Sequence, residues 1–161
     1  YQYRAELGNA IVNFARVVPD GLLVFFPSYG VMRSCVSLWK SHGTPTIWER
    51  ICAAKHAVVE PSNKAEFHQA FGEFNAALGL QTGRLDGKFV DPEDGAVART
   101  GEVARHKGGA VFFAVCRGKV SEGIDFPDKA GRAVILTGTA VGRFPNPGTL
   151  FQAPFVTSTS H

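Results

Sequence analysis

Short apolar runs alternate with amphipathic stretches along most of the 161-residue chain. The runs LLVFF at residues 22–26 and GAVFFAV at 109–115 are continuous, which is typical of strands buried on both faces of a parallel sheet. Two further runs, AVVE at 57–60 and RAVILT at 132–137, predict two more strands. Helical patterns separate these strands, so the sequence predicts an α/β domain with a parallel sheet and right-handed crossovers.

Apolar stripes and end signals mark the predicted helices. Apolar residues at helical spacing predict helices over residues 4–18 and 31–40. Thr46 and Glu49 have the spacing of a capping box, which predicts a short helix through Cys52. A fourth helix is expected because Asn63 and Glu66 have the spacing of a capped helix start. A long apolar stripe at helical spacing follows, formed by Phe67, Ala70, Phe71, Phe74, Ala77 and Leu78.

Two long segments break this alternation. Residues 79–108 are rich in glycine and charge and have little periodicity, so they are predicted to form a flexible insertion. Residues 139–161 hold three prolines and end in a Ser/Thr-rich stretch, which predicts an irregular, disordered tail. The predicted organisation is one lobe over residues 1–138, interrupted by the insertion and followed by the tail.

Composition narrows the class of protein. A hydrophobic fraction of 45% and a charged fraction of 19% are ordinary for a soluble globular domain. The formal net charge of +3 is compatible with an anionic partner without requiring one. No apolar run is long enough to span a membrane. The three cysteines form no CxxC pair and the five histidines have no metal-ligand spacing, so we expect reduced thiols in an intracellular protein, and neither a metal site nor a Ser–His hydrolase.

Two polar segments directly follow predicted strands. PSY at 27–29 follows the strand at 22–26, and RGKVSEGID lies within residues 116–126, after the strand at 109–115. Ligands bind beyond the carboxyl ends of strands in open parallel sheets. We therefore expect both segments on the ligand-binding edge of the sheet.

RGKVSEGID has the chemistry of a phosphate-binding loop. Arg117 and Lys119 supply cations for phosphate oxygens, and Ser121 supplies a hydroxyl donor. Gly118 and Gly123 allow the backbone to approach a phosphate closely. The segment therefore favours contact with a nucleotide or a nucleic-acid backbone.

The residues alone leave alternatives open. Glu122 or Asp125 is suited to accept a hydrogen bond from a ribose hydroxyl or from a partner arginine. A solvated turn whose charges bind nothing explains the same segment equally well. Ser28 could simply cap the helix that follows, and Tyr29 could simply pack against the core.

The same segments resemble a known family. GNAIVNFARVVPDGLLVFFPSY, IWERI, VVEPSNKAEF and GAVFFAVCRGKVSEGIDFPDKAGRAVILTG are similar to the second motor domain of the iron–sulfur superfamily 2 DNA helicases, the group of the XPD, DinG and Fanconi group J helicases. Within it the likeness is greatest to the telomere-elongation regulators, especially plant and algal forms. The resemblance covers residues 1 to about 138. It implies a RecA-like lobe, one of two that clamp ATP and move 5′ to 3′ on single-stranded DNA.

The resemblance also implies roles for the two polar segments. FFPSY corresponds to motif IV, which implies that Ser28 and Tyr29 lie along the DNA path. RGKVSEGIDF corresponds to motif V, which links DNA contacts to the ATP cleft. The residues implied toward DNA are Arg117, Gly118, Lys119 and Ser121, and those implied toward the cleft are Glu122, Gly123 and Asp125.

Cofactors and partners follow from the same resemblance. ATP and Mg²⁺ would be shared with a first lobe, and a 4Fe–4S cluster would belong to that first lobe alone. The implied partners are single-stranded or branched DNA and the first helicase lobe, with no membrane. The implied setting is the nucleus, in DNA repair and telomere maintenance.

The chain also departs from the family pattern. It contains no Walker A motif and no GxGxxG, and no QxxGRxxR follows residues 132–137 to supply the arginine finger of motif VI. Arg143 stands in a GR pair without the rest of that motif, so the finger is not assigned to it. We expect this chain alone to be inactive, and we interpret it, since it begins without Met, as a fragment or excised domain. The alternative is a truncated, non-catalytic fragment that binds nucleic acid or a partner.

Overall fold

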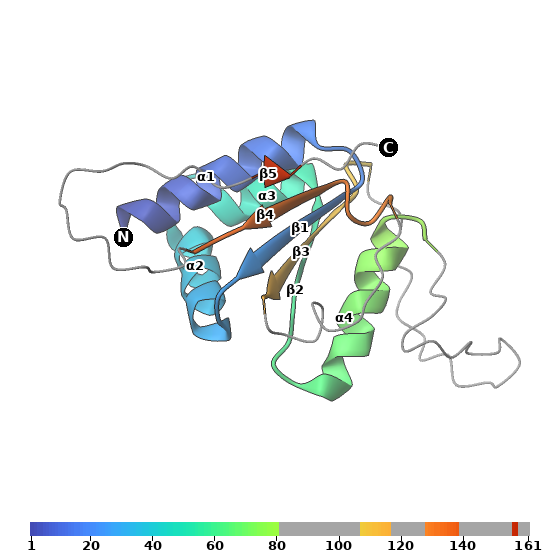
Figure 1. Cartoon of the computed structure of the whole chain (residues 1–161). Coiled ribbons are helices and arrows are strands. Elements are labelled where there is room, and N and C mark those ends of the chain that lie inside the picture. Colours follow the sequence, from blue (N-terminus) through green and yellow to red (C-terminus); the bar gives the residue numbers. More distant parts are fainter. Residues whose placement is uncertain (81–106, 117–127, 139–155, 158–161) are drawn as a thin grey trace, which may run out of the picture.

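The computed structural model describes residues 1–80, 107–116, 128–138 and 156–157 (Figure 1). The four predicted strands and four predicted helices are all present, with small shifts at their ends. The elements in chain order are α1 (Gln2–Val17), β1 (Gly21–Phe26), α2 (Tyr29–Ser41), α3 (Ile47–Ala54), β2 (His56–Val59), α4 (Lys64–Ala77), β3 (Ala110–Val115), β4 (Ala133–Leu136) and β5 (Val156–Thr157).

The strands form one sheet in the order β2-β3-β1-β4-β5 (Figure 1). β1 is the central strand, since it pairs in parallel with β3 on one side and with β4 on the other. Val24 of β1 aligns with Phe113 of β3 and with Ile135 of β4. β2 extends the sheet in parallel beside β3. These four parallel strands and their helices confirm the predicted α/β class and agree with a RecA-like lobe.

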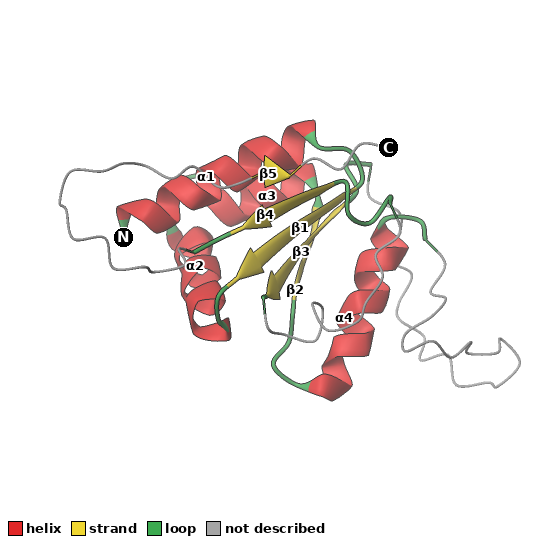
Figure 2. Ribbon diagram, viewed as in Figure 1, coloured by secondary structure: helices red, strands yellow, loops and turns green. Residues whose placement is uncertain are grey.

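Helices cover both faces of the sheet (Figure 2). α1, α2 and α3 pack on one face, where Leu22, Val24 and Phe26 of β1 are buried. α4 packs on the other face, where Leu23 and Phe112 are buried. Because successive strand residues point to opposite faces, a strand covered on both sides has to be apolar at every position. This two-sided burial explains the continuous apolar run from which β1 was predicted.

An aromatic cluster joins the elements of the three-helix face. Trp39 of α2 is fully buried, and its ring packs against Phe26 of β1 and Phe113 of β3, with ring centroids 6.2 and 5.7 Å apart. Its indole Nε1 donates a hydrogen bond to the carbonyl oxygen of Arg4 in α1 at 2.7 Å. The Trp39 side chain therefore joins α2 to α1 and to two strands, and its polar atom is satisfied.

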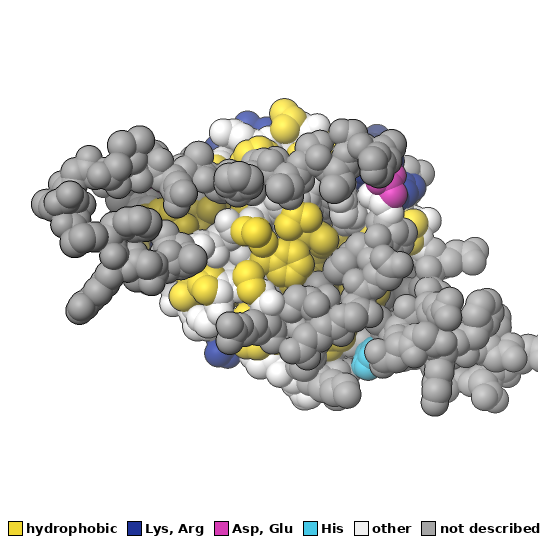
Figure 3. Space-filling view, in the orientation of Figure 1, with side chains coloured by type: hydrophobic (Ala, Val, Ile, Leu, Met, Phe, Trp, Pro, Cys, Tyr) yellow, Lys and Arg dark blue, Asp and Glu magenta, His cyan; other side chains and the backbone are white. Residues whose placement is uncertain are grey.

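The predicted aromatic stripe of α4 forms the core of the opposite face. Phe71 and Phe74 contact Phe112 of β3 edge to face, with ring centroids 6.3 and 5.3 Å apart. Burial decreases toward β4, where Val134 is half-buried and Leu136 is exposed. Figure 3 shows apolar side chains gathered over the strands in this view.

The capping box predicted before α3 is present. Oγ1 of Thr46 accepts a hydrogen bond from the N–H of Glu49 at 3.2 Å. The carboxylate of Glu49 accepts one from the N–H of Thr46 at 2.7 Å. These reciprocal bonds satisfy backbone donors that the first turn of a helix leaves unpaired, so α3 begins at Ile47.

The two segments that break the sequence pattern are described only in small part. Residues 81–106, most of the insertion predicted at 79–108, lie outside the described residues. Within residues 139–161, where no element was predicted, β5 pairs antiparallel with β4, so the sheet is mixed at this edge. A strand of two residues has no periodicity to detect, which is why the sequence did not indicate it.

Candidate functional site

The carboxyl ends of β1, β3 and β4 meet at one edge of the sheet, called the ligand edge below. Cys116, the first residue after β3, donates a backbone hydrogen bond to the carbonyl oxygen of Phe26, the last residue of β1, at 2.8 Å. Thr137, just beyond β4, donates to the carbonyl oxygen of Phe25 from its N–H at 2.8 Å and from its hydroxyl at 3.0 Å. The predicted convergence of residues 27–29 with the start of the segment after β3 is therefore confirmed at Cys116.

Ser28 caps α2 at the ligand edge. Its Oγ accepts a hydrogen bond from the N–H of Val31 at 3.3 Å, and its backbone is extended, as an N-cap requires. The cap starts α2 at Tyr29, slightly earlier than the apolar stripe predicted. The capping role that the sequence left open is confirmed. Ser28 itself is exposed, so its hydroxyl is also accessible from solvent.

Tyr29 is half-buried beside this cap. Its ring packs against the three-helix core, and its hydroxyl donates a hydrogen bond to Oε1 of Glu60 at 2.7 Å. Burial raises the pKa of Tyr29 to about 12, with further contributions from the hydrogen bond to Glu60 and from its charge. The phenol is therefore neutral at physiological pH. The packing role that the sequence left open is confirmed.

Glu60 is a buried acidic residue of the ligand edge and directly follows β2. Only 2% of its surface is exposed. Oε1 accepts from the Tyr29 hydroxyl, and Oε2 accepts from the N–H of Val115 at 2.8 Å. Its own N–H donates to the carbonyl oxygen of Phe113 at 2.8 Å. Hydrogen bonds to both oxygens offset the cost of burying such a group.

Sequence reasoning missed Glu60 as a site residue, because it was assigned to the strand at 57–60. One signal was available. A carboxylate that directly follows a buried strand stands at the edge where ligands bind. What the sequence does not contain is the identity of its partners, Tyr29 and Val115, which the sheet order brings to it.

The remaining predicted site residues follow Cys116 in the chain and lie outside the described residues. The structure fixes the start of their segment at the ligand edge, and the roles assigned to them stay predictions. They are Arg117, Gly118, Lys119, Ser121, Glu122, Gly123 and Asp125.

A buried lysine lies at the edge of the sheet opposite the ligand edge, where the strands begin. Lys55, fully buried just before β2, donates from Nζ to the carbonyl oxygen of Asp20 at 2.7 Å and to that of Gly108. Those two residues precede β1 and β3. Burial lowers the pKa of Lys55 to about 8, and the charge of Asp20 works against this shift. Lys55 therefore ties together the amino ends of three strands.

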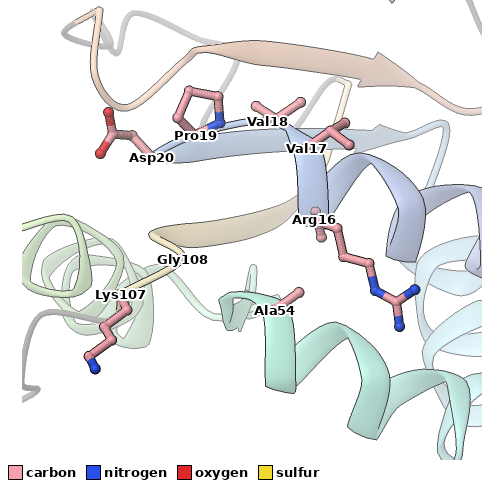
Figure 4. Close-up of a pocket in the computed structure, with 9 residues that line it drawn as sticks. Arg16, Val17, Val18, Pro19, Asp20, Ala54, Lys107 and Gly108 are labelled. Atoms are coloured by element: carbon pink, nitrogen blue, oxygen red, sulfur yellow. The ribbon is translucent and has the colours of Figure 1, made fainter.

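A pocket opens on the same opposite edge. Figure 4 shows the side chains of Arg16, Asp20 and Lys107 pointing in different directions around it. Charges that diverge do not converge on one ligand group, so this pocket is not the candidate site. Its lining residues are Ala15, Arg16, Val17, Val18, Pro19, Asp20, Ala54, Lys107 and Gly108.

Metal-binding clusters and membrane-spanning helices are both absent from the described part of the chain. Within it, no three His, Cys, Asp or Glu side chains come together as a metal site requires. Nor does this part contain a helix with the length and apolar character needed to cross a membrane. Cys35, Cys52 and Cys116 are free thiols, and burial raises the pKa of each.

The chain is similar to known helicases. The profile of the helicase C-terminal domain matches residues 11–153. The regulator of telomere elongation helicase 1 homolog of Arabidopsis thaliana is 44% identical over 158 residues, which cover 96% of this chain and 13% of that protein. The homolog from Oryza sativa subsp. japonica is 47% identical over 143 residues, covering 85% of this chain and 12% of that protein. The homolog from Drosophila persimilis is 39% identical over 155 residues, covering 96% of this chain and 12% of that protein.

These similarities confirm the resemblance drawn from the sequence, including its greater likeness to plant forms. The chain spans only 12–13% of the length of these three relatives.

Proposed function

Since the chain belongs to the helicase C-terminal domain family, we propose that it acts as the second RecA-like lobe of an ATP-dependent DNA helicase. In this proposal the helicase moves 5′ to 3′ and serves telomere maintenance and DNA repair in the nucleus. The observation that carries the proposal is the ligand edge. There the segment after β1, with Ser28 and Tyr29, lies beside the start of the segment after β3, at Cys116.

The proposed DNA contacts are mainly to phosphates. Ser28 offers a hydroxyl and Tyr29 part of an aromatic ring at the ligand edge. The motif V residues proposed to add cations, backbone amides and a hydroxyl are Arg117, Gly118, Lys119 and Ser121. Phosphate contacts read no bases and release counterions, so binding to single-stranded or branched DNA should be weak, salt-sensitive and nearly independent of sequence.

The proposed nucleotide site is shared between two lobes. Glu122, Gly123 and Asp125 face the cleft from this lobe, and ATP with Mg²⁺ is held chiefly by the first lobe, which also carries the 4Fe–4S cluster. Phosphoryl transfer supplies the energy for movement when ATP is bound. A segment that contacts both nucleotide and DNA changes its DNA contacts when the nucleotide state changes, which couples the two ligands.

A second candidate is a non-catalytic fragment that binds nucleic acid or a partner. It is favoured by the lack of a Walker A motif and of QxxGRxxR within the 161 residues. The coding sequence on either side of this segment separates the two candidates. In-frame Walker A and QxxGRxxR motifs would support the helicase lobe, and their absence from the gene would support the fragment.

The proposed DNA site is tested by fluorescence anisotropy with labelled single-stranded oligonucleotides at low salt. Changing Arg117 and Lys119 together to alanine should weaken binding about equally for all sequences. The matched control changes Arg16 and Lys107 to alanine, which removes the same charge from the opposite edge of the sheet. Deletion of residues 81–106 tests whether the cations of that segment bind DNA instead.

The outcomes of this experiment are distinct. Selective loss of affinity in the Arg117/Lys119 variant supports the proposed site. Equal loss in the control variant means that binding reflects net charge alone. Unchanged affinity in the Arg117/Lys119 variant removes the site.

A further inference from the structure

We propose that Glu60 is a positioning residue of the nucleic-acid site. In this proposal its buried carboxylate holds the phenol of Tyr29 and the end of β3 in one fixed arrangement, so that the ligand edge meets DNA in a single geometry. The inference rests on the proposed function, because it assigns a residue that sets the shape of the same site without touching DNA.

The contacts of Glu60 join three adjacent strand ends. The side chain comes from the end of β2, and its backbone is fixed by the N–H bond to the carbonyl oxygen of Phe113 in β3. Oε1 receives the hydroxyl of Tyr29, which follows β1, and Oε2 receives the N–H of Val115, which ends β3. The carboxylate therefore spans the space between the two segments to which DNA contacts are assigned.

The bond to Tyr29 restricts an aromatic ring at the ligand edge. A tyrosine ring has only two side-chain torsions, and a hydroxyl held at 2.7 Å from Oε1 of Glu60 fixes both. The ring is partly buried against the three-helix core, and it directly follows the Ser28 cap in the chain. A ring held in this way presents one orientation to a base or sugar, which lowers the entropy lost when single-stranded DNA binds.

The bond to Val115 acts on the second segment. Val115 is the last residue of β3, and Cys116 after it is bonded to Phe26. Two successive backbone N–H groups are thus fixed, one to Glu60 and one to β1. The backbone at Val115 and Cys116 is therefore held in place in part by Glu60.

A negative charge near a DNA path has an effect of its own, with the opposite sign. Phosphates are repelled by a carboxylate, so if Glu60 acted only as a charge, its neutralisation would strengthen binding. If it acts by position, removal of its hydrogen bonds weakens binding even though a negative charge is lost. The two roles therefore predict changes of opposite direction for the same variant.

The test measures single-stranded DNA binding by anisotropy and folding by thermal unfolding, for the unaltered chain, four single variants and one double variant. Tyr29→Phe removes only the hydroxyl contact. Glu60→Ala removes the contacts to Tyr29 and Val115, and Glu60→Gln keeps these two without charge, since an amide accepts from Val115 and donates to the phenol. Glu73→Gln is the control. It removes the same charge from α4, away from the ligand edge, where Glu73 pairs with His56 at the start of β2.

We expect Tyr29→Phe to weaken binding by about threefold to tenfold, the effect of losing one hydrogen bond of typical net strength. Glu60→Ala should weaken it at least as much. Glu60→Gln and Glu73→Gln should stay within about twofold of the unaltered chain, the span of a few tenths of a kcal/mol. Adding Tyr29→Phe to Glu60→Ala should cause no further loss, because both changes break the same contact.

Two results would overturn the inference while leaving the proposed function intact. One is unchanged binding by folded Tyr29→Phe, which does not depend on whether Glu60→Ala folds. The other is tighter binding by Glu60→Gln and Tyr29→Phe alike. Failure of the unaltered chain to bind any single-stranded DNA would instead overturn the proposed function, and this inference with it.

Discussion

A Cβ atom at position 8 would lie 2.4 Å from Nε1 of Trp39, so the glycine of α1 and the indole of α2 occupy adjoining space. The same Cβ would lie 2.8 Å from Cγ2 of Ile47, at the start of α3. Trp39 and Ile47 are both buried, so moving either would disturb a close-packed core. Gly8 therefore allows three helices to approach one another closely.

The substitution Gly8→Ala should destabilise the protein. Alanine in a helix gains about 1 kcal/mol over glycine, but overpacking a buried contact costs about 1–3 kcal/mol, and the second effect should win here. Gly30→Ala in α2 is the matched control, because the nearest atom to its added Cβ, Oγ of Ser28, is 3.9 Å away. Urea unfolding of both variants checks the prediction, which fails if Gly8→Ala is as stable as Gly30→Ala.

The buried Lys55 should make stability increase with pH. Its pKa in the folded protein, about 8, lies below the ordinary value of 10.5, so folding disfavours the protonated form. That penalty is constant below about pH 8 and is relieved as pH rises toward the ordinary pKa. Relative to Lys55→Met, the free energy of unfolding of the unaltered chain should rise by roughly 1–2 kcal/mol between about pH 7.5 and about pH 9.5. Parallel pH profiles for the two proteins would contradict this.

Two substitutions at Ser28 separate its cap from its proposed DNA contact. Ser28→Ala should lower the free energy of unfolding by about 1 kcal/mol, because the N–H of Val31 loses its acceptor, whereas glycine at an N-cap costs only a few tenths. If the hydroxyl also contacts a phosphate, Ser28→Gly and Ser28→Ala should weaken DNA binding equally despite their different stabilities. Binding by Ser28→Gly equal to that of the unaltered chain would leave Ser28 as a cap alone.

The chain by itself should release no phosphate from ATP, with or without single-stranded DNA. Phosphoryl transfer requires a phosphate cradle, a bound Mg²⁺ and cations that stabilise the transition state, and loss of an arginine finger alone costs about a thousandfold or more in rate. The sequence contains neither Walker A nor QxxGRxxR. Phosphate release is compared with that of a form extended through QxxGRxxR of the parent gene and mixed with the first lobe. DNA-stimulated turnover by the short chain would contradict the prediction.

The strands and helices were predictable because burial against the sheet requires apolar residues in a regular pattern along the sequence. The strands at 22–26 and 109–115 are apolar throughout because helices cover both sides of the sheet, and the stripe on α4 records the single face that it buries. The cap residues Thr46 and Glu49 are local in the sequence, so their spacing alone identified the start of α3. Hydrogen bonds between residues close in the chain can therefore be predicted from residue spacing.

The long-range contacts were not predictable in the same way. In the sequence, Glu60 and Lys55 each look like an ordinary charged residue beside a short strand. Both become buried only when distant segments fold against them, and their structural roles depend on that burial. Glu60 accepts hydrogen bonds from Tyr29 and Val115, which are distant from it in the chain, and no local stretch of sequence reveals the strand order that brings them together. Of the candidate site, the sequence indicated the edge and its strand ends, but not the carboxylate that joins them.

The central place of β1 has a consequence for the growing chain. β1 ends at Phe26, whereas its two neighbours begin only at Ala110 and Ala133. At ribosomal speeds of about 5–20 residues per second, β1 is finished on the order of ten seconds before either neighbour exists. During that interval LLVFF is an unpaired edge that invites pairing with other nascent chains. Synthesis that stops before Leu136 therefore releases a chain whose central strand lacks a neighbour, and such products should depend on chaperones to stay in solution.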